Sequence, residues 1–315
     1  MTNERARRLL VRSIVPAAYL AIAGAVFAKQ GVPIDRSLLT VWILGLLLCF
    51  SLGNLFDFVR SLLLEWLPLL AALTLYDILR GIGGGRVPIH GEFQIWIDRY
   101  VFGFGSVPSV WLQQHLWNPA HVGVVDDAAY LTYMSFFLAT PVALGVLWLV
   151  DRKGFRLWAR QLTLISFAAV ACFTACPTIP PWLAAQKGMI GNVQRLVGPI
   201  GGSLPPFDGR NLWENGLRLA NDLASFPSLH EGMTVLFSIL LWRRVPRAVR
   251  PLLVAYPLAM AFSLVYLGEH YVCDLVAGAA LAWLVTYSEP RLLRALQARL
   301  RRRRAVDAEP VAEPA

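Results

Sequence analysis

Two histidines and one aspartate have a spacing that could support catalysis. His230 opens one apolar run, His270 precedes another, and Asp274 follows four residues later. Residues four apart on a helix are neighbours, so the Asp274 carboxylate can reach a ring N–H of His270. That contact would fix the imidazole tautomer and make its other nitrogen more nucleophilic. The pattern predicts nucleophilic and acid–base chemistry by histidine.

The separation of the two histidines has a geometric meaning. About 40 residues lie between them, with a basic turn at 243–250 midway. Twenty helical residues rise about 30 Å, so the chain descends one span and returns along the next. Both imidazoles then reach the same depth on one face, beside the free helix-start amides near Ser228. A single histidine at a membrane interface is more often structural, but two at one depth favour a phosphoryl-transfer site that needs no metal.

The composition places these residues in a membrane. The chain is 57% hydrophobic and only 16% charged, with a mean hydropathy of +0.53, outside the usual range of soluble domains. Its apolar runs approach the length that crosses a bilayer, and they occupy 13–28, 38–56, 61–79, 129–150, 161–176, 231–242, 252–268 and 271–288. We therefore predict an all-α polytopic membrane bundle of about eight spans.

The basic residues favour one orientation. Most of the 29 Lys and Arg fall near both termini and at the turns around 152–160 and 243–250. The positive-inside rule then puts the termini in the cytoplasm and the histidines on the extracytoplasmic face. We interpret the arginines of 299–304 as an anchor for acidic lipid headgroups rather than a nucleic-acid arm. The excess of Arg over Lys is typical of a high-GC bacterium, so we expect a bacterial cell membrane protein that retains its first apolar run.

Two long segments join the spans on the extracytoplasmic side. The segment 81–128 has aromatic and aliphatic residues at helical spacing, which predicts helices in the membrane interface. The segment 177–224 is rich in proline at its start and carries several cations. Loops of this length are usually functional, so we expect both segments to cover the site.

We divide the chain into three parts on this basis. Residues 1–128 hold the first spans and the outer interfacial segment, and 129–288 form the catalytic helical core. Residues 289–315 form a basic cytoplasmic tail that we expect to be disordered at its end.

Two segments resemble the signature of the type 2 phosphatidic acid phosphatase superfamily. Residues 226–230 (Phe-Pro-Ser-Leu-His) resemble its Pro-Ser-Gly-His box, with Leu229 where glycine is usual. Residues 263–274 are similar to its Ser-Arg-x5-His-x3-Asp box, with Leu264 where arginine is usual. The two boxes have the right separation, and the resemblance is firm over about 220–288.

The remaining box of that superfamily, Lys-x6-Arg-Pro, has no good match. Lys153 and Arg160 have its spacing, but Gln161 follows them and the predicted topology puts them on the cytoplasmic side. We therefore expect the phosphate-binding cations in the outer segment, where the candidates are Lys187, Arg195, Arg210 and Arg218.

In lacking the Lys-x6-Arg-Pro box, the chain resembles one branch of the superfamily, the aureobasidin-sensitive inositol phosphorylceramide synthases. The similar features are the Pro-Pro-Trp turn at 180–182 and the run 266–274, Tyr-Leu-Gly-Glu-His-Tyr-Val-Cys-Asp. The resemblance implies that His270 forms a phospho-histidine, that Asp274 orients it, and that His230 is the acid and then the base. It also implies that Ser228 and helix amides hold phosphate oxygens, and we add Tyr266 to the substrate-binding candidates.

Two reactions fit these residues. The first is a phosphotransferase that moves a phosphate-linked headgroup, similar to phosphoinositol, between a lipid and an alcohol. The second is a lipid-phosphate or polyprenyl-phosphate phosphatase with water as acceptor. The missing cationic box favours the transferase, because a phosphate dianion needs more positive charge than a diester does.

A transporter is disfavoured because the polar residues gather at one face and no paired halves are visible. No cofactor is expected, and the oligomeric state stays open.

Overall fold

The computed structural model describes residues 2–30, 36–82, 90–103, 105–202 and 224–307. Every regular element within these residues is a helix, which confirms the all-α prediction. The N-terminal part forms α1 (Thr2–Gln30), α2 (Arg36–Ser51) and a bent helix made of α3 (Leu55–Ser61), η1 (Leu62–Trp66) and α4 (Leu67–Ile82). The C-terminal part contains α7 (Val124–Val150), α8 (Arg152–Ala175), α12 (Leu229–Trp242), η3 (Arg247–Val249), α13 (Arg250–Tyr266) and α14 (Val272–Asp307).

Short helices occupy the two long connecting segments. The first contains α5 (Glu92–Ile97), η2 (Asp98–Phe102) and α6 (Pro108–Leu116), and the second contains α9 (Pro181–Gln186) and α10 (Val197–Gly201). Helices are therefore present in the segment 81–128, as predicted. Several of their large apolar side chains are exposed, among them Trp96, Tyr100 and Trp111. Such side chains suit a membrane interface, which stays a prediction.

The long helices have the composition of membrane spans. Five helical stretches are long and apolar enough to cross a bilayer: Leu55–Gly81, Val124–Val150, Arg152–Ala175, Arg247–Tyr266 and Val272–Arg301. Three apolar stretches are shorter: Ser13–Lys29, Leu38–Ser51 and Leu229–Trp242. Each coincides with one predicted apolar run, so the polytopic bundle is confirmed. The number of helices that cross the membrane stays a prediction, because length and composition alone do not decide it for the shorter ones.

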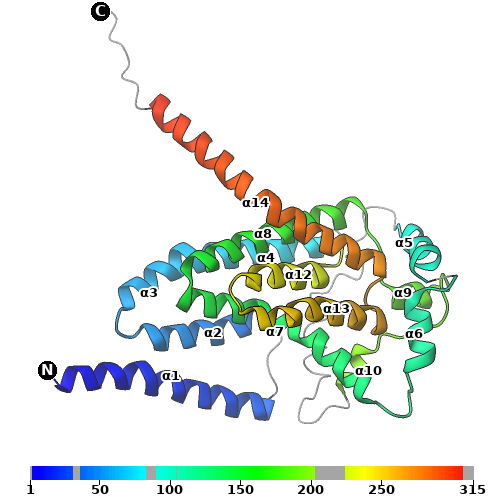
Figure 1. Ribbon diagram of the computed structural model, residues 1–315, viewed down its shortest axis with the longest axis horizontal. Coiled ribbons are helices and arrows are strands. Elements are labelled where there is room, and N and C mark those ends of the chain that lie inside the picture. Colours follow the sequence, from blue (N-terminus) through cyan, green and yellow to red (C-terminus); the bar gives the residue numbers. More distant parts are fainter. Residues whose placement is uncertain (1, 31–35, 83–89, 104, 203–223, 308–315) are drawn as a thin grey trace, which may run out of the picture.

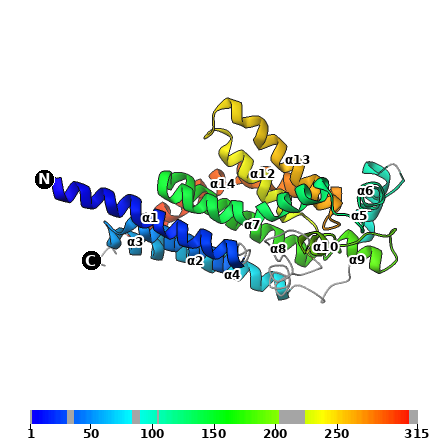
Figure 2. The same cartoon turned by 90° about the horizontal axis from the view of Figure 1, so that it is seen from below.

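The bundle has two distinct ends. The turn between α13 and α14 lies at the same end as α5, α6 and α9, whereas the start of α1 and the end of α14 lie at the opposite end (Figures 1 and 2). At that opposite end an ion pair between Arg244 and Asp151, 3.1 Å long, joins the α12–α13 and α7–α8 turns. The helix α14 continues without a break through 289–307, into the part predicted to be a separate tail.

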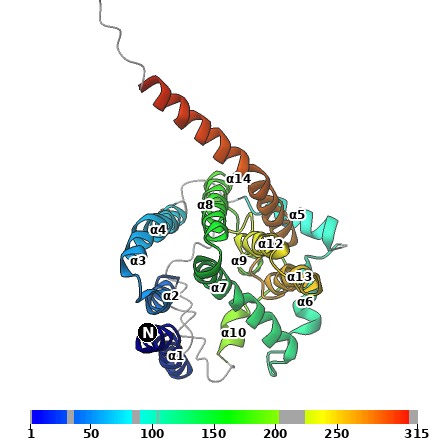
Figure 3. The ribbon, with the colours of Figure 1, turned by 60° about the vertical axis from the view of Figure 1, so that its left-hand side comes forward.

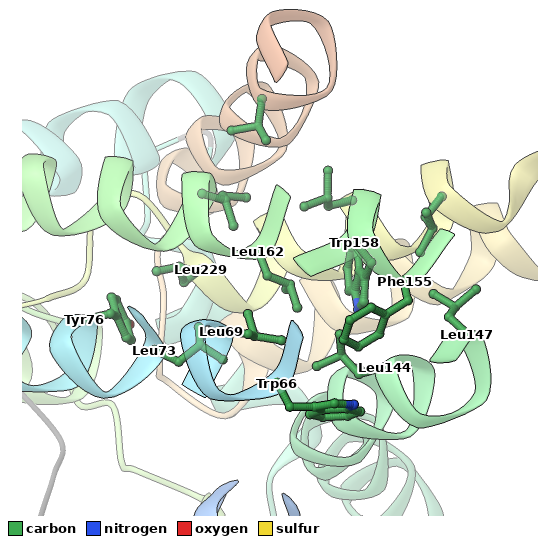
Figure 4. Packing of buried hydrophobic residues seen from close by; sticks show 14 of the residues in the cluster. Trp66, Leu69, Leu73, Tyr76, Leu144, Leu147, Phe155, Trp158, Leu162 and Leu229 are labelled. Atoms are coloured by element: carbon green, nitrogen blue, oxygen red, sulfur yellow. The ribbon is translucent and has the colours of Figure 1, made fainter. Parts of the chain in front are cut away.

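The core of the bundle surrounds α12. This helix packs against α7, α8, α13 and α14, and Figure 3 shows it among them in a view close to the bundle direction. A second region of close packing joins η1, α4, α7 and α8, where the rings of Trp66 in η1 and Phe155 in α8 lie 5.2 Å apart beside Trp158 (Figure 4). Van der Waals packing of this kind holds helices together where lipid replaces water. The packing presents the first turn of α12 to the first turn of α14.

Candidate active site

His270 lies in the tight turn between α13 and α14. Gly268 has a φ of +79°, a conformation that side chains with a Cβ rarely adopt, and it reverses the chain after α13. The backbone N–H groups of Glu269 and His270 both donate to the Leu264 carbonyl, at 3.0 and 3.2 Å. The turn is therefore rigid, and it holds the His270 side chain almost completely buried.

Asp274 is fully buried in the first turn of α14 and accepts hydrogen bonds on both carboxylate oxygens. Oδ1 accepts from Gln94 Nε2 at 2.5 Å, and Oδ2 accepts from Ser225 Oγ at 2.7 Å. The Tyr271 amide donates to Oδ2 at 3.1 Å, and His270 Nδ1 lies 3.3 Å from the same oxygen. The carboxylate is thus held in place by three N–H or O–H donors besides the histidine.

The contact with Asp274 determines which nitrogen of His270 is available. A carboxylate only accepts hydrogen bonds, so Nδ1 carries the proton that points at Asp274. Nε2 then bears the lone pair and can act as a nucleophile. The structure brings His270 and Asp274 together in the manner that their spacing predicted.

His230 lies in the first turn of α12 and faces His270. The centroids of the two rings are 5.6 Å apart, and the ring planes meet at 61°. Aromatic residues of α7 surround His230, with the ring of Phe136 at 4.4 Å and that of Tyr133 at 5.3 Å. One phosphorus atom between the two imidazoles could be attacked by one and have its leaving group protonated by the other.

Ser228 caps the helix that carries His230. Its Oγ accepts from the Glu231 amide at 3.3 Å, and its own amide donates to the Asp274 carbonyl at 2.9 Å. The side chain is fully buried. The serine therefore links the first turns of α12 and α14, and its hydroxyl hydrogen has no acceptor among the described residues.

The other substrate-binding candidates have different surroundings. The Tyr266 hydroxyl donates to Asp126, which puts this buried tyrosine at the interface of α13 and α7. Lys187 follows α9 and is exposed. Arg210 and Arg218 lie outside the described residues.

Among the described candidate cations, Arg195 lies beside the turn at 267–271 that carries His270, which we call the catalytic turn. Its Nε and Nη2 donate to the two carboxylate oxygens of Glu269, at 2.7 and 3.1 Å. Its guanidinium also stacks over the Trp182 ring, 4.7 Å from the centroid. By contrast, Arg160 pairs with Glu289 at 2.5 Å and lies about 22 Å along α8 from the end nearest the site.

Several residues that support this site were not among those predicted from the sequence. Gln94 and Ser225 hold Asp274, and Asp98 accepts from the amides of Val272 and Cys273 at the start of α14, at 2.8 and 3.0 Å. Gln94 and Asp98 are polar residues four apart within an apolar stretch, and this spacing was the available signal. Burial raises the pKa of Asp98 to about 6, outweighing the two amide hydrogen bonds, which act in the opposite direction.

Gln113 of α6 also supports the site, and no pattern in the sequence predicted this role. Its Nε2 donates to the carbonyls of Gln194 and Tyr266, at 2.9 and 2.8 Å, and its Oε1 accepts from the Gln194 amide at 2.8 Å. Both outer segments are therefore attached to the catalytic turn.

The described part of the chain offers no cluster of metal ligands. Within the described residues, no group of three or more His, Cys, Asp or Glu side chains could hold a metal ion. The expectation of a reaction without a cofactor stays a prediction.

The part of the chain that holds His230, His270 and Asp274 matches a known family. Residues 104–288, more than half of the chain, match the model of the PAP2 superfamily. The chain belongs to the PAP2 superfamily. This membership confirms the superfamily that the motifs at 226–230 and 263–274 predicted, and it confirms the prediction of a membrane enzyme of the phosphotransferase or phosphatase class.

Three fungal members with curated names are similar to this PAP2 chain. The inositol phosphorylceramide synthase catalytic subunit of Schizosaccharomyces pombe is 27% identical over 53% of this chain and 37% of its own length. The catalytic subunit of Saccharomyces cerevisiae is 25% identical over 51% of this chain and 41% of its own length. The inositol phosphorylceramide synthase of Candida albicans is 26% identical over 52% of this chain and 36% of its own length. The chain thus spans about two fifths of the curated relatives it matches, and these carry the name of the predicted branch. No solved structure matches the chain significantly.

Proposed function

We propose that this protein is a membrane lipid phosphotransferase that moves a phosphoinositol-like headgroup between a lipid and an alcohol. The observation that carries the proposal is the facing pair of imidazoles, with ring centroids 5.6 Å apart and one ring held by a buried carboxylate. This pair supplies a nucleophile and a proton carrier on opposite sides of one phosphorus atom.

In the first half-reaction, Nε2 of His270 attacks the phosphorus of the donor phosphodiester. A P–N bond forms, and the bond from phosphorus to the lipid alcohol oxygen breaks. His230, as the imidazolium, gives its proton to that oxygen, so a neutral lipid alcohol leaves. Asp274 stabilises the positive charge that develops on the His270 ring.

In the second half-reaction, the hydroxyl of the acceptor attacks the same phosphorus. Neutral His230 takes the hydroxyl proton, the new P–O bond forms and the P–N bond breaks. Both histidines return to their starting protonation states. The Ser228 hydroxyl and the first amides of α12 are suited to hold the phosphate oxygens through both steps.

Two observations support an alcohol rather than water as the acceptor. Aromatic rings from α7 surround His230, and apolar walls of this kind exclude water from a reactive intermediate. The similar fungal proteins are named as inositol phosphorylceramide synthases, and a synthase activity fits an alcohol acceptor better than water. We also propose that the site faces the extracytoplasmic side of a bacterial membrane, with both termini in the cytoplasm, because the basic turns lie at the other end of the bundle.

The test uses the purified full-length chain in detergent. Wild type and His270→Ala are compared on a phosphatidylinositol-like diester and on phosphatidic acid, each with and without an alcohol acceptor. We expect diester turnover that requires the acceptor and falls by at least about 10³-fold in His270→Ala. Free phosphate from phosphatidic acid without any diester turnover would identify a phosphatase instead. Equal activity of the mutant on both substrates would overturn the assignment of His270.

A further inference from the structure

We propose that Glu269 sets the charge preference of the active site, and that its pair with Arg195 admits a phosphodiester monoanion while disfavouring a phosphomonoester dianion. This inference rests on the proposed function and deepens it, because it names the class of phosphate that the site accepts. It concerns a carboxylate that plays no part in the two half-reactions.

The Arg195–Glu269 pair is a built feature and not a chance surface contact. The carboxylate is buried, with 9% of its side chain exposed, and it is bound by two parallel N–H donors of the guanidinium. Parallel donation of this kind fixes both partners in one plane. The Trp182 ring covers the guanidinium from one side.

The backbones on both sides of the pair are also fixed. The Leu196 amide donates to the Leu267 carbonyl and the Trp182 amide donates to the Gly268 carbonyl, each at 3.2 Å. Gln113 ties Gln194 to the end of α13. The carboxylate and the guanidinium therefore cannot move away from the catalytic turn without breaking several hydrogen bonds.

The pair is close enough to the reaction to affect it. Glu269 is the chain neighbour of His270, so their Cα atoms lie about 3.8 Å apart. His270 faces His230, with ring centroids 5.6 Å apart. A phosphate bound between the two rings therefore lies beside the turn that carries Glu269 and its partner Arg195.

The consequence for substrates follows from Coulomb's law. Glu269 offsets the positive charge that Arg195 would otherwise offer, and it repels each negative charge on a bound phosphate. A phosphodiester carries one such charge, whereas a phosphomonoester carries nearly two at neutral pH. The penalty is larger for the monoester, so the pair favours diesters.

The experiment measures the ratio of kcat/KM on phosphatidic acid to kcat/KM on a phosphatidylinositol-like diester. The release of lipid alcohol is followed for both substrates, with the full-length chain in detergent. Glu269→Gln keeps an oxygen that accepts from Arg195 and removes the charge, so we expect the monoester-to-diester ratio to rise at least about tenfold. Arg195→Gln leaves the carboxylate uncompensated, so the ratio is expected to fall.

The matched control is Glu289→Gln. Glu289 is another buried carboxylate paired with an arginine, Arg160, at 2.5 Å, but it lies in the part of α14 far from the catalytic turn. Its substitution is expected to leave the ratio unchanged. A ratio that stays within about twofold of wild type in folded Glu269→Gln would overturn the inference.

A measurement on the wild type covers the case in which the variants do not fold. A phosphonate monoester of the lipid, a monoanion like a phosphodiester, is expected to inhibit at least about tenfold more strongly than the corresponding lipid phosphonic acid, which ionises to a dianion. Equal inhibition would overturn the inference. Turnover that does not require an alcohol acceptor would contradict the proposed transferase but not the inference about Glu269. The ratio of kcat/KM values depends only on release of the lipid alcohol, which occurs whether the acceptor is an alcohol or water.

Discussion

The backbones of Gly278 in α14 and Ser228 at the start of α12 touch each other. A Cβ atom built on Gly278 would overlap the carbonyl oxygen of Ser228, and one built on Gly232 would lie 2.9 Å from the carbonyl oxygen of Gly278. Glycine at both positions lets the two helices approach at backbone distance, as small residues do between membrane helices. This approach allows the first turns that carry His230 and Asp274 to meet.

Gly278→Ala is expected to lower kcat by about 100-fold, because a shift of about 1 Å between catalytic groups costs a factor of that size. It is also expected to lower the free energy of unfolding by about 1–3 kcal/mol through overpacking. The measurements are turnover and thermal unfolding in detergent. Gly24→Ala in α1 is the matched control, since nothing lies within 4 Å of a Cβ at that position. Full activity in folded Gly278→Ala would contradict the role of this contact.

Ser225→Ala is expected to lower kcat about 10- to 100-fold. It removes the Oγ–H that donates to Asp274 at 2.7 Å, and a hydrogen bond to a charged group contributes about 1.5–3 kcal/mol. Ser109→Ala is the control, because the Ser109 hydroxyl is equally buried and has no hydrogen-bond partner among the described residues. Equal loss of kcat in both variants would show that the effect is not specific to the carboxylate.

Asp98 predicts a pH dependence of stability. Burial raises its pKa from 3.8 to about 6, so between these values the folded chain holds a proton that the unfolded chain has lost. This group therefore stabilises the fold below pH 3.8, and that contribution is lost as the pH rises to about 6. The difference in free energy of unfolding between wild type and Asp98→Asn should fall by about 2 kcal/mol from pH 4.5 to 7.5. A difference that stays constant over this range, measured by chemical unfolding, would contradict the raised pKa.

Chelation of divalent metals is expected to leave turnover unchanged. The proposed reaction uses only histidine nitrogens and hydrogen-bond donors, and both oxygens of Asp274 already accept hydrogen bonds. The measurement is diester turnover with and without EDTA. A loss of activity that one divalent ion restores specifically would argue against this mechanism.

The fold class was predictable because lipid imposes it. A polar backbone in hydrocarbon must satisfy its own hydrogen bonds, so long apolar runs can only be helices in this chain. The same argument predicted the depth of His230 and His270, because one helix down and one helix up return the chain to its starting level. The helix boundaries differ from the bounds of the predicted apolar runs. The predicted run at 161–176 belongs to a helix that starts at Arg152, because Asp151 caps it by accepting from the Gly154 amide at 2.9 Å.

The helical membrane bundle, the superfamily and the contact between His270 and Asp274 were predictable, because they depend on local periodicity and short spacings. The distant residues that complete the site became known from the three-dimensional fold. Gln94 lies 180 residues from Asp274, and Arg195 lies 74 residues from Glu269. Such contacts depend on how the outer segments fold back onto the α13–α14 turn, and no short-range pattern encodes that path. The close approach of α12 and α14 likewise needed the structure, because a glycine in a sequence does not show which backbone it faces.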